Sequence, residues 1–239
     1  MVYKDVALFS RPMGVAIDRH GTMYVSDSRM QRIYKITSDG TVAAYAGTGK
    51  EGADNAVDPL QASFSGPRGL AVGPNDELYV ADCMNNAVRR IDATGVTTVV
   101  TDQRYVSGVA AGNDGAVYFS TIIKGQIGVL RNGQVAILAN VAGNAGDREG
   151  PAAEARLQPG EGMLVEADRV LFVDTQNNRV RALSLTGPAL VSTVYGDGNA
   201  TDDPHDAQHT WLPRALVPWN GGYAVSDFGS RRVLWFEPA

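Results

Sequence analysis

Short apolar runs, separated by Gly, Asp and Asn, recur along the whole chain. One such run is Met-Tyr-Val-Ser-Asp at 23–27, and closely related runs stand at 78–82 and 223–227. Short runs that are rich in β-branched and aromatic residues and bounded by turn residues are typical of β-strands. No stretch of useful length has the period of an amphipathic helix. The pattern therefore predicts an all-β protein.

The runs are grouped in five units, each predicted to be a small antiparallel meander of four strands. The units begin at Pro12, Pro67, Val106, Pro159 and Pro213, so that successive starts lie 55, 39, 53 and 54 residues apart. One small meander cannot bury both faces, whereas several stacked around an axis can. We therefore expect residues 1–239 to form a single domain, a five-bladed β-propeller. Because the fifth unit ends one strand short, segment 2–9 is expected to complete the last blade.

A longer motif repeats with these strands. It reads Pro-x-Gly-Val-Ala-x-Asp, then Tyr-Val-Ser/Ala-Asp, then Asn-x-Arg-Ile/Val. This motif resembles the NHL repeat, and the resemblance covers essentially the whole chain. It implies a β-propeller. The family includes protein-binding and RNA-binding domains and a few enzymes, such as a zinc-dependent peptide-amidating lyase, so the fold by itself names no activity.

Composition and charge narrow the function classes. The chain has 239 residues, 44% of them hydrophobic, and a formal net charge of −5. A chain of this length can bury a large core. Because the chain is acidic and has no cluster of Lys and Arg residues, we expect no nucleic-acid partner. No apolar stretch is long enough for a membrane helix and no signal-peptide pattern stands at the start, so the sequence is compatible with the cytoplasm and predicts no membrane partner. Cys83 is the single cysteine, so the chain can form no intramolecular disulfide. We expect the protein to be a monomer.

Two motifs suggest cofactors on first sight. Gly47-Thr-Gly-Lys-Glu-Gly52 matches a dinucleotide fingerprint but lacks the helix that must follow it, so no cofactor is predicted. His205 and His209 have a spacing that suits zinc on a helix, but Pro204 precedes them and no third ligand is evident. The two histidines are the candidate metal ligands of the chain, but their pattern is too incomplete for the sequence to predict a metal site.

A carboxylate and a guanidinium recur around the turn that follows the second strand. Three units have Asp with Arg five residues later, whereas the other two have Asp82 with Ala87 and Thr121 with Gln126. The three pairs are Asp27 with Arg32, Asp174 with Arg179, and Asp227 with Arg232. Such groups on opposite sides of a hairpin predict a hydrogen-bonded pair that fixes the turn.

The innermost strand of each blade begins at one mouth of the propeller's central channel, where the five units differ. The ligand-binding candidates at this position are Met13, Arg68, Ser107, Glu161 and Arg214. Unlike groups that converge on a concave surface predict a binding site. The two arginines are suited to a carboxylate or phosphate, with Glu161 orienting one of them or acting on a substrate. In the alternative interpretation, Arg68 and Glu161 only neutralise each other.

Two functions are consistent with a binding site at the mouth of the central channel. The first is a binding module for a small acidic molecule or a peptide. The second is an enzyme of lyase or hydrolase type, in which the arginines stabilise an anion and Glu161, Tyr105 or His209 moves a proton. An RNA-binding domain would need a basic face, which the composition disfavours. The sequence favours the binding module and leaves catalysis open.

Overall fold

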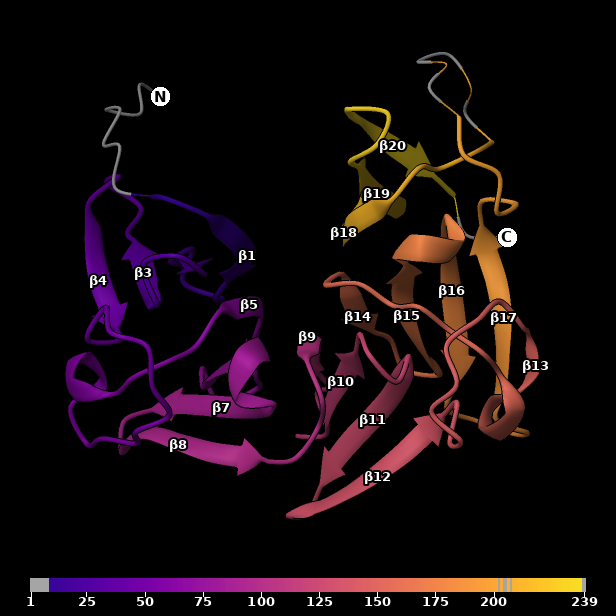
Figure 1. Ribbon diagram of the computed structural model, residues 1–239. Coiled ribbons are helices and arrows are strands. Elements are labelled where there is room, and N and C mark those ends of the chain that lie inside the picture. Colours follow the sequence, from indigo (N-terminus) through magenta and orange to yellow (C-terminus); the bar gives the residue numbers. More distant parts are fainter. Residues whose placement is uncertain (1–8, 202, 204–205, 207, 238–239) are drawn as a thin grey trace. The chain divides into compact units, whose positions relative to one another are not determined.

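The computed structural model describes residues 9–201, 203, 206 and 208–237, and its regular structure consists of β-strands with a few short 3-10 turns (Figure 1). By its internal contacts the chain divides into two compact units, Met1–Ala116 and Val117–Ala239, which we call the first and the second unit. In the described part of the chain, no helix is long and apolar enough to span a membrane.

The first unit contains two complete four-stranded sheets and one further strand. Blade 1 consists of β1 (Pro12–Ile17), β2 (Met23–Asp27), β3 (Arg32–Ile36) and β4 (Val42–Ala46). Blade 2 consists of β5 (Pro67–Val72), β6 (Leu78–Asp82), β7 (Ala87–Asp92) and β8 (Gly95–Val100). The further strand is β9 (Val106–Ala111). The first strands β1, β5 and β9 are in contact, as expected for the inner strands of adjacent blades.

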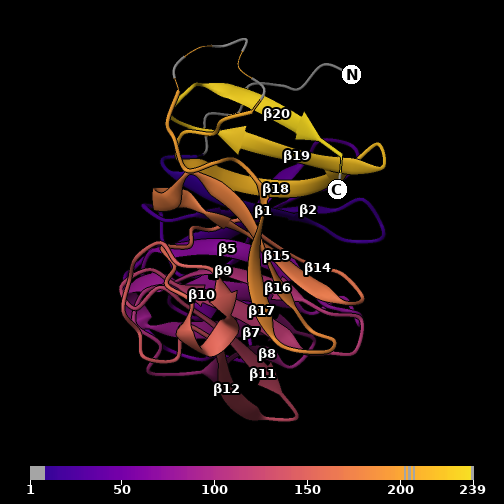
Figure 2. The same ribbon diagram turned by 90° about the vertical axis from the view of Figure 1, so that its right-hand side faces the viewer.

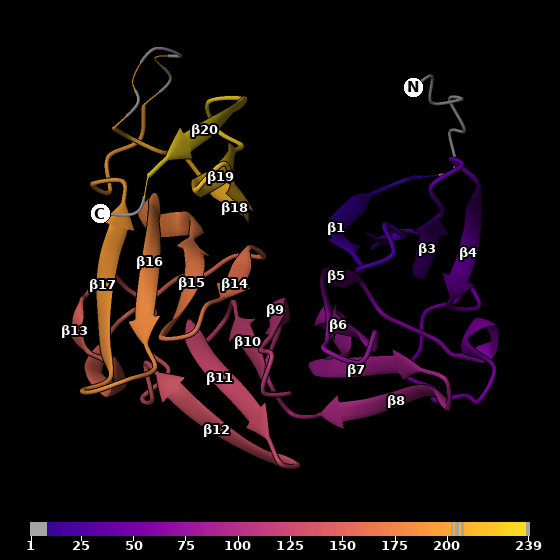
Figure 3. The same cartoon turned by 180° about the vertical axis from the view of Figure 1, so that it is seen from behind.

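The second unit contains the remaining strands, seen from two further directions in Figures 2 and 3. Blade 3 has the order β12-β11-β10-β9, with β10 (Val117–Thr121), β11 (Gln126–Arg131) and β12 (Gln134–Ala139). Blade 4 has the order β13-β17-β16-β15-β14, with β13 (Gly150–Pro151), β14 (Met163–Val165), β15 (Arg169–Asp174), β16 (Arg179–Ser184) and β17 (Leu190–Tyr195). Blade 5 consists of β18 (Pro213–Trp219), β19 (Gly222–Asp227) and β20 (Arg232–Phe236), which lie side by side in Figure 2.

The predicted class is confirmed: these sheets are the five blades of an all-β propeller fold. Blade 4 differs from the prediction because a loop contributes β13 as a fifth strand. Blade 5 has three strands in the described residues. Of the segment expected to complete it, residues 2–8 lie outside the described residues. The ring of Phe9 packs edge-on against Tyr34 of β3, with 5.3 Å between centroids.

Hydroxyl groups hold the main chain at the start of several inner strands. Ser26 Oγ donates to the carbonyl of Arg68 (2.5 Å), and Ser120 Oγ donates to the carbonyl of Gly160 (2.9 Å). Thr175 Oγ1 donates to the carbonyl of Pro213 (2.7 Å). Each bond joins one blade to the next within the same unit. These bonds fix the backbone at Arg68, beside Glu161 and beside Arg214, which are three of the predicted site residues.

The core of each unit is made by apolar side chains between adjacent blades. In the first unit, Ile33, Phe64 and Val80 have no exposed surface, and they belong to one cluster shared by blades 1 and 2. In the second unit, Leu171 and Val225 belong to a cluster shared by blades 4 and 5. Tight burial of this kind leaves the polar turns as the places where the blades can differ.

Candidate functional site

The predicted site residues are divided between the two units. Met13, Arg68 and Ser107 belong to the first unit, whereas Glu161 and Arg214 belong to the second. The two arginines occupy the same position in their blades, and each lines a pocket of its own unit. We describe the two pockets separately.

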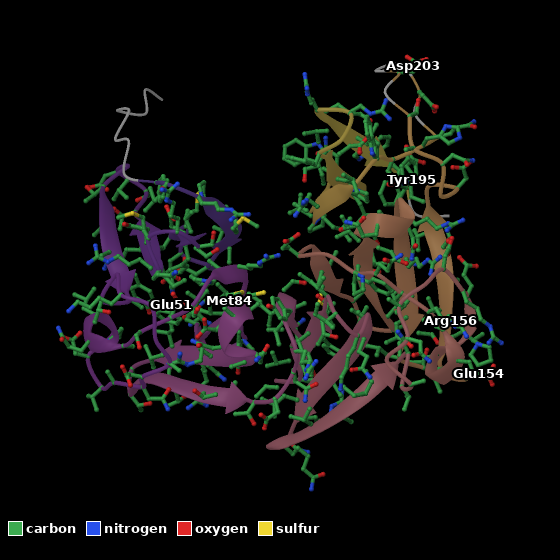
Figure 4. All side chains as sticks on the ribbon, viewed as in Figure 1. Glu51, Met84, Glu154, Arg156, Tyr195 and Asp203 are labelled. Carbon is green, nitrogen blue, oxygen red and sulfur yellow. The ribbon has the colours of Figure 1, made fainter. Side chains whose placement is uncertain are left out.

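The pocket of the first unit has a volume of about 260 Å³. Met13 and Arg68 both line it, as does Glu51, which accepts a hydrogen bond from Ser65 Oγ (2.6 Å). Figure 4 marks Glu51 and Met84, which are part of the same lining. Ser107 has no exposed surface, so the residue predicted as the hydroxyl of the site is enclosed in β9.

The pocket of the second unit is larger, with a volume of about 800 Å³. Its volume lies within the usual range for small-molecule sites, about 300–1,000 Å³. Cationic and aromatic side chains dominate its lining, and both kinds come from the ends of the three strands of blade 5. The lining includes Trp211, Arg214, Asp227, Phe228, Arg231 and Arg232.

A buried carboxylate builds the frame of this pocket. Asp227 is 1% exposed and accepts bonds from the Trp211 N–H (2.6 Å) and from Arg232 Nε (3.1 Å). The Gly229 N–H donates to the Trp211 carbonyl (2.7 Å). A Cβ at Gly229 would lie 2.3 Å from Trp211 Cγ, so only glycine lets the indole lie against this backbone. Asp227 and Gly229 therefore fix the aromatic wall of the pocket.

Arg214 presents its guanidinium to this pocket. Its Nη1 lies 3.3 Å from Glu161 Oε1 and 3.4 Å from Oε2, both long for a charge-assisted bond. Its Cζ lies 5.1 Å from the centroid of the Phe228 ring, within cation–π range. In the described residues these are the contacts of the guanidinium, and 39% of the side chain is exposed. Arg214 is therefore oriented but not saturated by its neighbours.

Arg231 is held in a backbone conformation that disfavours its side chain. Its φ is 56°, in the left-handed region, at the last residue of the turn before β20. Blades 2 and 4 have Asn86 and Asn178 at the same position, with φ of 57° and 53°. Asn tolerates this region, whereas a long side chain there costs about 1–3 kcal/mol. Blade 1 also has a long side chain at this position, Gln31 with φ of 53°, so Arg231 is distinguished by its place in the pocket lining.

The turn-fixing ion pairs were predicted correctly in one blade of three. Asp227 pairs with Arg232, but Asp174 pairs with Arg181 (3.0 Å) rather than with Arg179. Arg179 instead bonds Asp147, which a loop brings to the side of the blade. Arg179 does lie opposite Asp174 in strand register, so the register was right and the side-chain partner was wrong.

Blades 1 and 2 also depart from the predicted pairing. Asp27 accepts the main-chain N–H groups of residues 10, 11, 29 and 30, and Arg32 donates to the Thr48 carbonyl (2.9 Å). In blade 2, where no pair was predicted, Asp82 pairs with the fully buried Arg89 (2.9 Å). Burial raises the pKa of Asp82 and of Asp174, an effect that the adjacent arginines oppose.

The remaining candidates lie elsewhere. His205 lies outside the described residues. His209 has both ring nitrogens occupied: Nδ1 contacts Asp206, and Nε2 lies 2.9 Å from Asp197 Oδ2. The bond to Asp206 raises the pKa of His209. Across residues 9–201, 203, 206 and 208–237, no group of three or more His, Cys, Asp or Glu side chains is placed to hold a metal.

Tyr105 belongs to the first unit, at the turn that leads into β9. It has φ of 56°, its N–H donates to Asn86 Oδ1 (3.0 Å), and 37% of it is exposed. Sequence reasoning missed the aromatic wall of the larger pocket. Trp211 aligns with Phe64 and Leu157, which are fully buried, yet Trp211 is 37% exposed. The signal available in the sequence was the larger, polar-tipped side chain at that position.

The comparisons with known proteins agree with this fold. Residues 64–91 match the family model of the NHL repeat. A chloroplast protein of Arabidopsis thaliana, SUPPRESSOR OF QUENCHING 1, is 26% identical over 192 residues, which are 68% of this chain and 18% of that protein. The chain therefore contains an NHL repeat within a five-bladed β-propeller fold and spans about a fifth of that relative.

Two solved structures have the same fold at low sequence identity. An auxiliary nutrient binding protein from Bacteroides ovatus has a TM-score of 0.74 at 17% identity, and the match covers 98% of this chain and 60% of that one. A streptogramin B lyase has a TM-score of 0.61 at 18% identity, with 93% and 63% covered. At such identities the likeness shows the fold alone.

Proposed function

We propose that this protein is a binding module whose second unit binds a small, flat carboxylate in the pocket around Arg214. The observation that carries the proposal is the placement of this guanidinium against the Phe228 ring, in a pocket of about 800 Å³ with Trp211 also in its lining. A guanidinium recognises a carboxylate by paired hydrogen bonds, and aromatic walls favour a planar ligand.

The charge of the pocket supports an anionic ligand. Three arginines and one aspartate line it, and the aspartate is buried and bonded to Arg232. Arg214 and Arg231 then give the pocket a positive field, although the whole chain carries −5. A concave pocket of one charge sign concentrates ligands of the opposite sign.

A binding function is favoured over catalysis because the candidate proton-transfer groups lie outside this lining. Neither Glu161 nor His209 is part of it, and Tyr105 belongs to the other unit. Glu161 orients Arg214 through its two contacts, and His209 is held between two aspartates. The structural neighbours include both classes, a nutrient binding protein and a lyase.

The proposal is tested by a thermal-shift screen with matched ligands. Benzoate, phthalate, citrate and phosphate are compared with benzamide, which keeps the shape of benzoate without its charge. At a hundredfold excess over the dissociation constant, a ligand stabilises the folded state by about 2.7 kcal/mol, which a melting curve resolves. We expect benzoate or phthalate to raise the melting temperature and benzamide to have no effect.

Two variants locate the site. Arg214→Gln keeps a polar side chain but shortens it and removes its charge, so it should weaken carboxylate binding by roughly 10–100-fold, the worth of a hydrogen bond to a charged group. Arg148→Gln is the control, because Arg148 lies in the same unit, is 53% exposed and pairs with Glu154 away from the pocket. An equal loss in both variants, or none in either, would contradict the proposal.

A further inference from the structure

Two of the outer strands in this protein are covered by a segment of the preceding loop. Beside β8, the Val96 N–H donates to the Ala56 carbonyl (2.8 Å), and the Ala56 N–H donates to the Val96 carbonyl (3.3 Å). Beside β17, the short strand β13 pairs antiparallel with Leu190 and Val191. The two strands lie side by side in Figures 1 and 3. In both cases a short extended segment caps the edge of a sheet.

The third blade has the same edge without a cap. Leu130 lies opposite Val135 in β12, just as Ile91 lies opposite Val96 in β8 and Leu183 lies opposite Val191 in β17. Val96 is 1% exposed and Val191 is 2% exposed, whereas Val135 is 41% exposed. Within the described chain, the N–H and C=O groups of residues 134–137 make no main-chain bond on the outer side of β12.

The missing cap has a cause in the sequence. The caps of β8 and β17 come from the long connections that lead into their own blades, residues 47–66 and 140–162. The connection that leads into blade 3 consists of residues 101–105 only. This short connection explains why the second and third repeats begin only 39 residues apart, at Pro67 and Val106. A loop of that length cannot supply a further strand.

A groove runs beside this open edge. It has a volume of about 420 Å³ and lies between the outer strands of blade 3 and the β16–β17 turn of blade 4. Apolar side chains supply most of its surface, among them Val129, Ala136, Leu138, Leu183 and Leu185. Alternate residues of β12 face this groove, and Val135 lies on the other face of the same strand.

We propose that the outer edge of β12 is a docking site for an extended segment of a partner protein, which adds to blade 3 as one more antiparallel strand. Alternate side chains of the segment would cover Val135 and enter the groove. Strand addition of this kind obtains affinity from main-chain bonds and specificity from pockets for alternate side chains. An exposed strand edge is a template for such pairing.

The chain's own caps show the chemistry that fits this edge. Ala56 faces Val96, and Gly150, Pro151 and Ala152 lie along β17, so small residues stand opposite the edge valine. The Ala152 N–H donates to the Ala189 carbonyl (2.9 Å), which continues the pairing. The expected segment therefore has small residues next to Val135 and an apolar side chain directed into the groove.

The test uses the caps as probes. Two synthetic peptides copy residues 53–59 and 147–153 and carry a fluorescent label, and their binding to the protein is measured by anisotropy. Hydrogen exchange of the amides of Val135 and Ile137, which point outward from β12 as Val96 does from β8, is followed with and without peptide. We expect at least one peptide to bind and to slow these amides by at least about tenfold, equivalent to about 1.4 kcal/mol of added protection.

Two variants complete the test. Val135→Lys places a charge on the edge, as natural edge strands do to prevent pairing, and should weaken peptide binding at least about tenfold. Val217→Lys is the matched control, because Val217 is a 51% exposed valine on β18, the first strand of blade 5 in the same unit. Melting curves establish that both variants are folded.

Three results would overturn this proposal. The first is that neither peptide slows the β12 amides. The second is equal peptide binding by the wild type and Val135→Lys. The third is a dimer, detected by sedimentation, in which these amides are protected without any peptide, because the occupant would then be a second copy of this chain.

Discussion

Blades 4 and 5 have the same turn after their second strand, but their arginines are used in opposite ways. In blade 4, Arg181 has no exposed surface and bonds the buried Asp174 (3.0 Å). In blade 5, Leu234 is the corresponding residue, seven positions after the Asp, and the cations Arg214 and Arg231 line a pocket. One blade uses its guanidinium for stability, and the other presents its guanidinium groups to solvent.

This difference distinguishes arginines that stabilise the fold from arginines that are available to bind a ligand. A cation that compensates a buried carboxylate is committed, and a ligand cannot use it. Arg232 shows the intermediate case, because it bonds Asp227 through Nε (3.1 Å) and the His209 carbonyl through Nη2 (2.9 Å). Of the three arginines in this pocket, Arg232 makes the most bonds to the described residues, and Arg214 and Arg231 keep more hydrogen-bonding capacity for a ligand. Substitutions at these positions test whether the two kinds of arginine differ.

Loss of the buried guanidinium should have the largest effect. Arg181→Met leaves Asp174 buried without its cation, so the free energy of unfolding should fall by about 3–5 kcal/mol. Urea denaturation measures the change. Since burial already raises the pKa of Asp174, and loss of the cation raises it further, the penalty should grow as pH rises from about 4 toward 7.

The double variant Asp174→Leu/Arg181→Met removes both charges and should recover much of this stability. If Arg181→Met costs no more than Arg214→Gln, then burial does not distinguish the two arginines, and the comparison between the blades is wrong.

Closing the space beside the indole should have the next largest effect. In Gly229→Ala the new methyl would lie 2.3 Å from Trp211 Cγ, so the indole has to move. We expect a loss of about 1–3 kcal/mol in stability, the usual cost of overpacking. The tryptophan emission should shift as the indole moves, and carboxylate binding should weaken. Gly146→Ala reports the background effect, because Gly146 has no left-handed backbone and a Cβ there would meet only the flexible Arg156 side chain, at 3.1 Å or more.

A smaller and opposite effect is expected at the strained arginine. Arg231→Asn places at φ 56° the residue type that blades 2 and 4 have at this position. The stability should rise by up to about 1 kcal/mol because Asn tolerates the left-handed region. Carboxylate affinity should fall at the same time. A variant that is both more stable and equally active in binding would mean that Arg231 has no role in the pocket.

The smallest effect concerns pH. The pKa of His209 is raised by its bond to Asp206, so the folded state favours the charged imidazole. This contribution is complete below the ordinary histidine pKa of about 6.5 and is lost as pH rises through the higher folded value. Melting curves between about pH 6 and 8 should therefore show a decline that His209→Gln removes.

The repeating pattern predicted most of the fold, because strand and turn residues are local signals. Alternating apolar runs and the Gly, Asp and Asn between them placed the blades and their order. The sequence did not predict β13, because Gly150 and Pro151 become a strand only where their loop meets β17. That contact depends on how the long loop folds onto its blade, which no short pattern encodes.

The candidate site could be predicted only by position. Comparing the blades identified the position of Arg214 as one where the side chains differ from blade to blade, and the structure places Arg214 in the larger pocket. The comparison could not identify Trp211 or Arg231, because their roles depend on a bare backbone at Gly229 and on a left-handed turn. The Asp174 partner was wrong for a similar reason, since Asp147 arrives from a loop and occupies Arg179.

The most direct test of the central claim is isothermal titration of the protein with benzoate, with Arg214→Gln and Arg181→Met measured in parallel. If Arg214 is the cation available to a ligand, Arg214→Gln loses at least about tenfold in affinity, whereas folded Arg181→Met binds as the wild type does. Equal affinity in the wild type and Arg214→Gln, or an equal loss in both variants, would contradict the account.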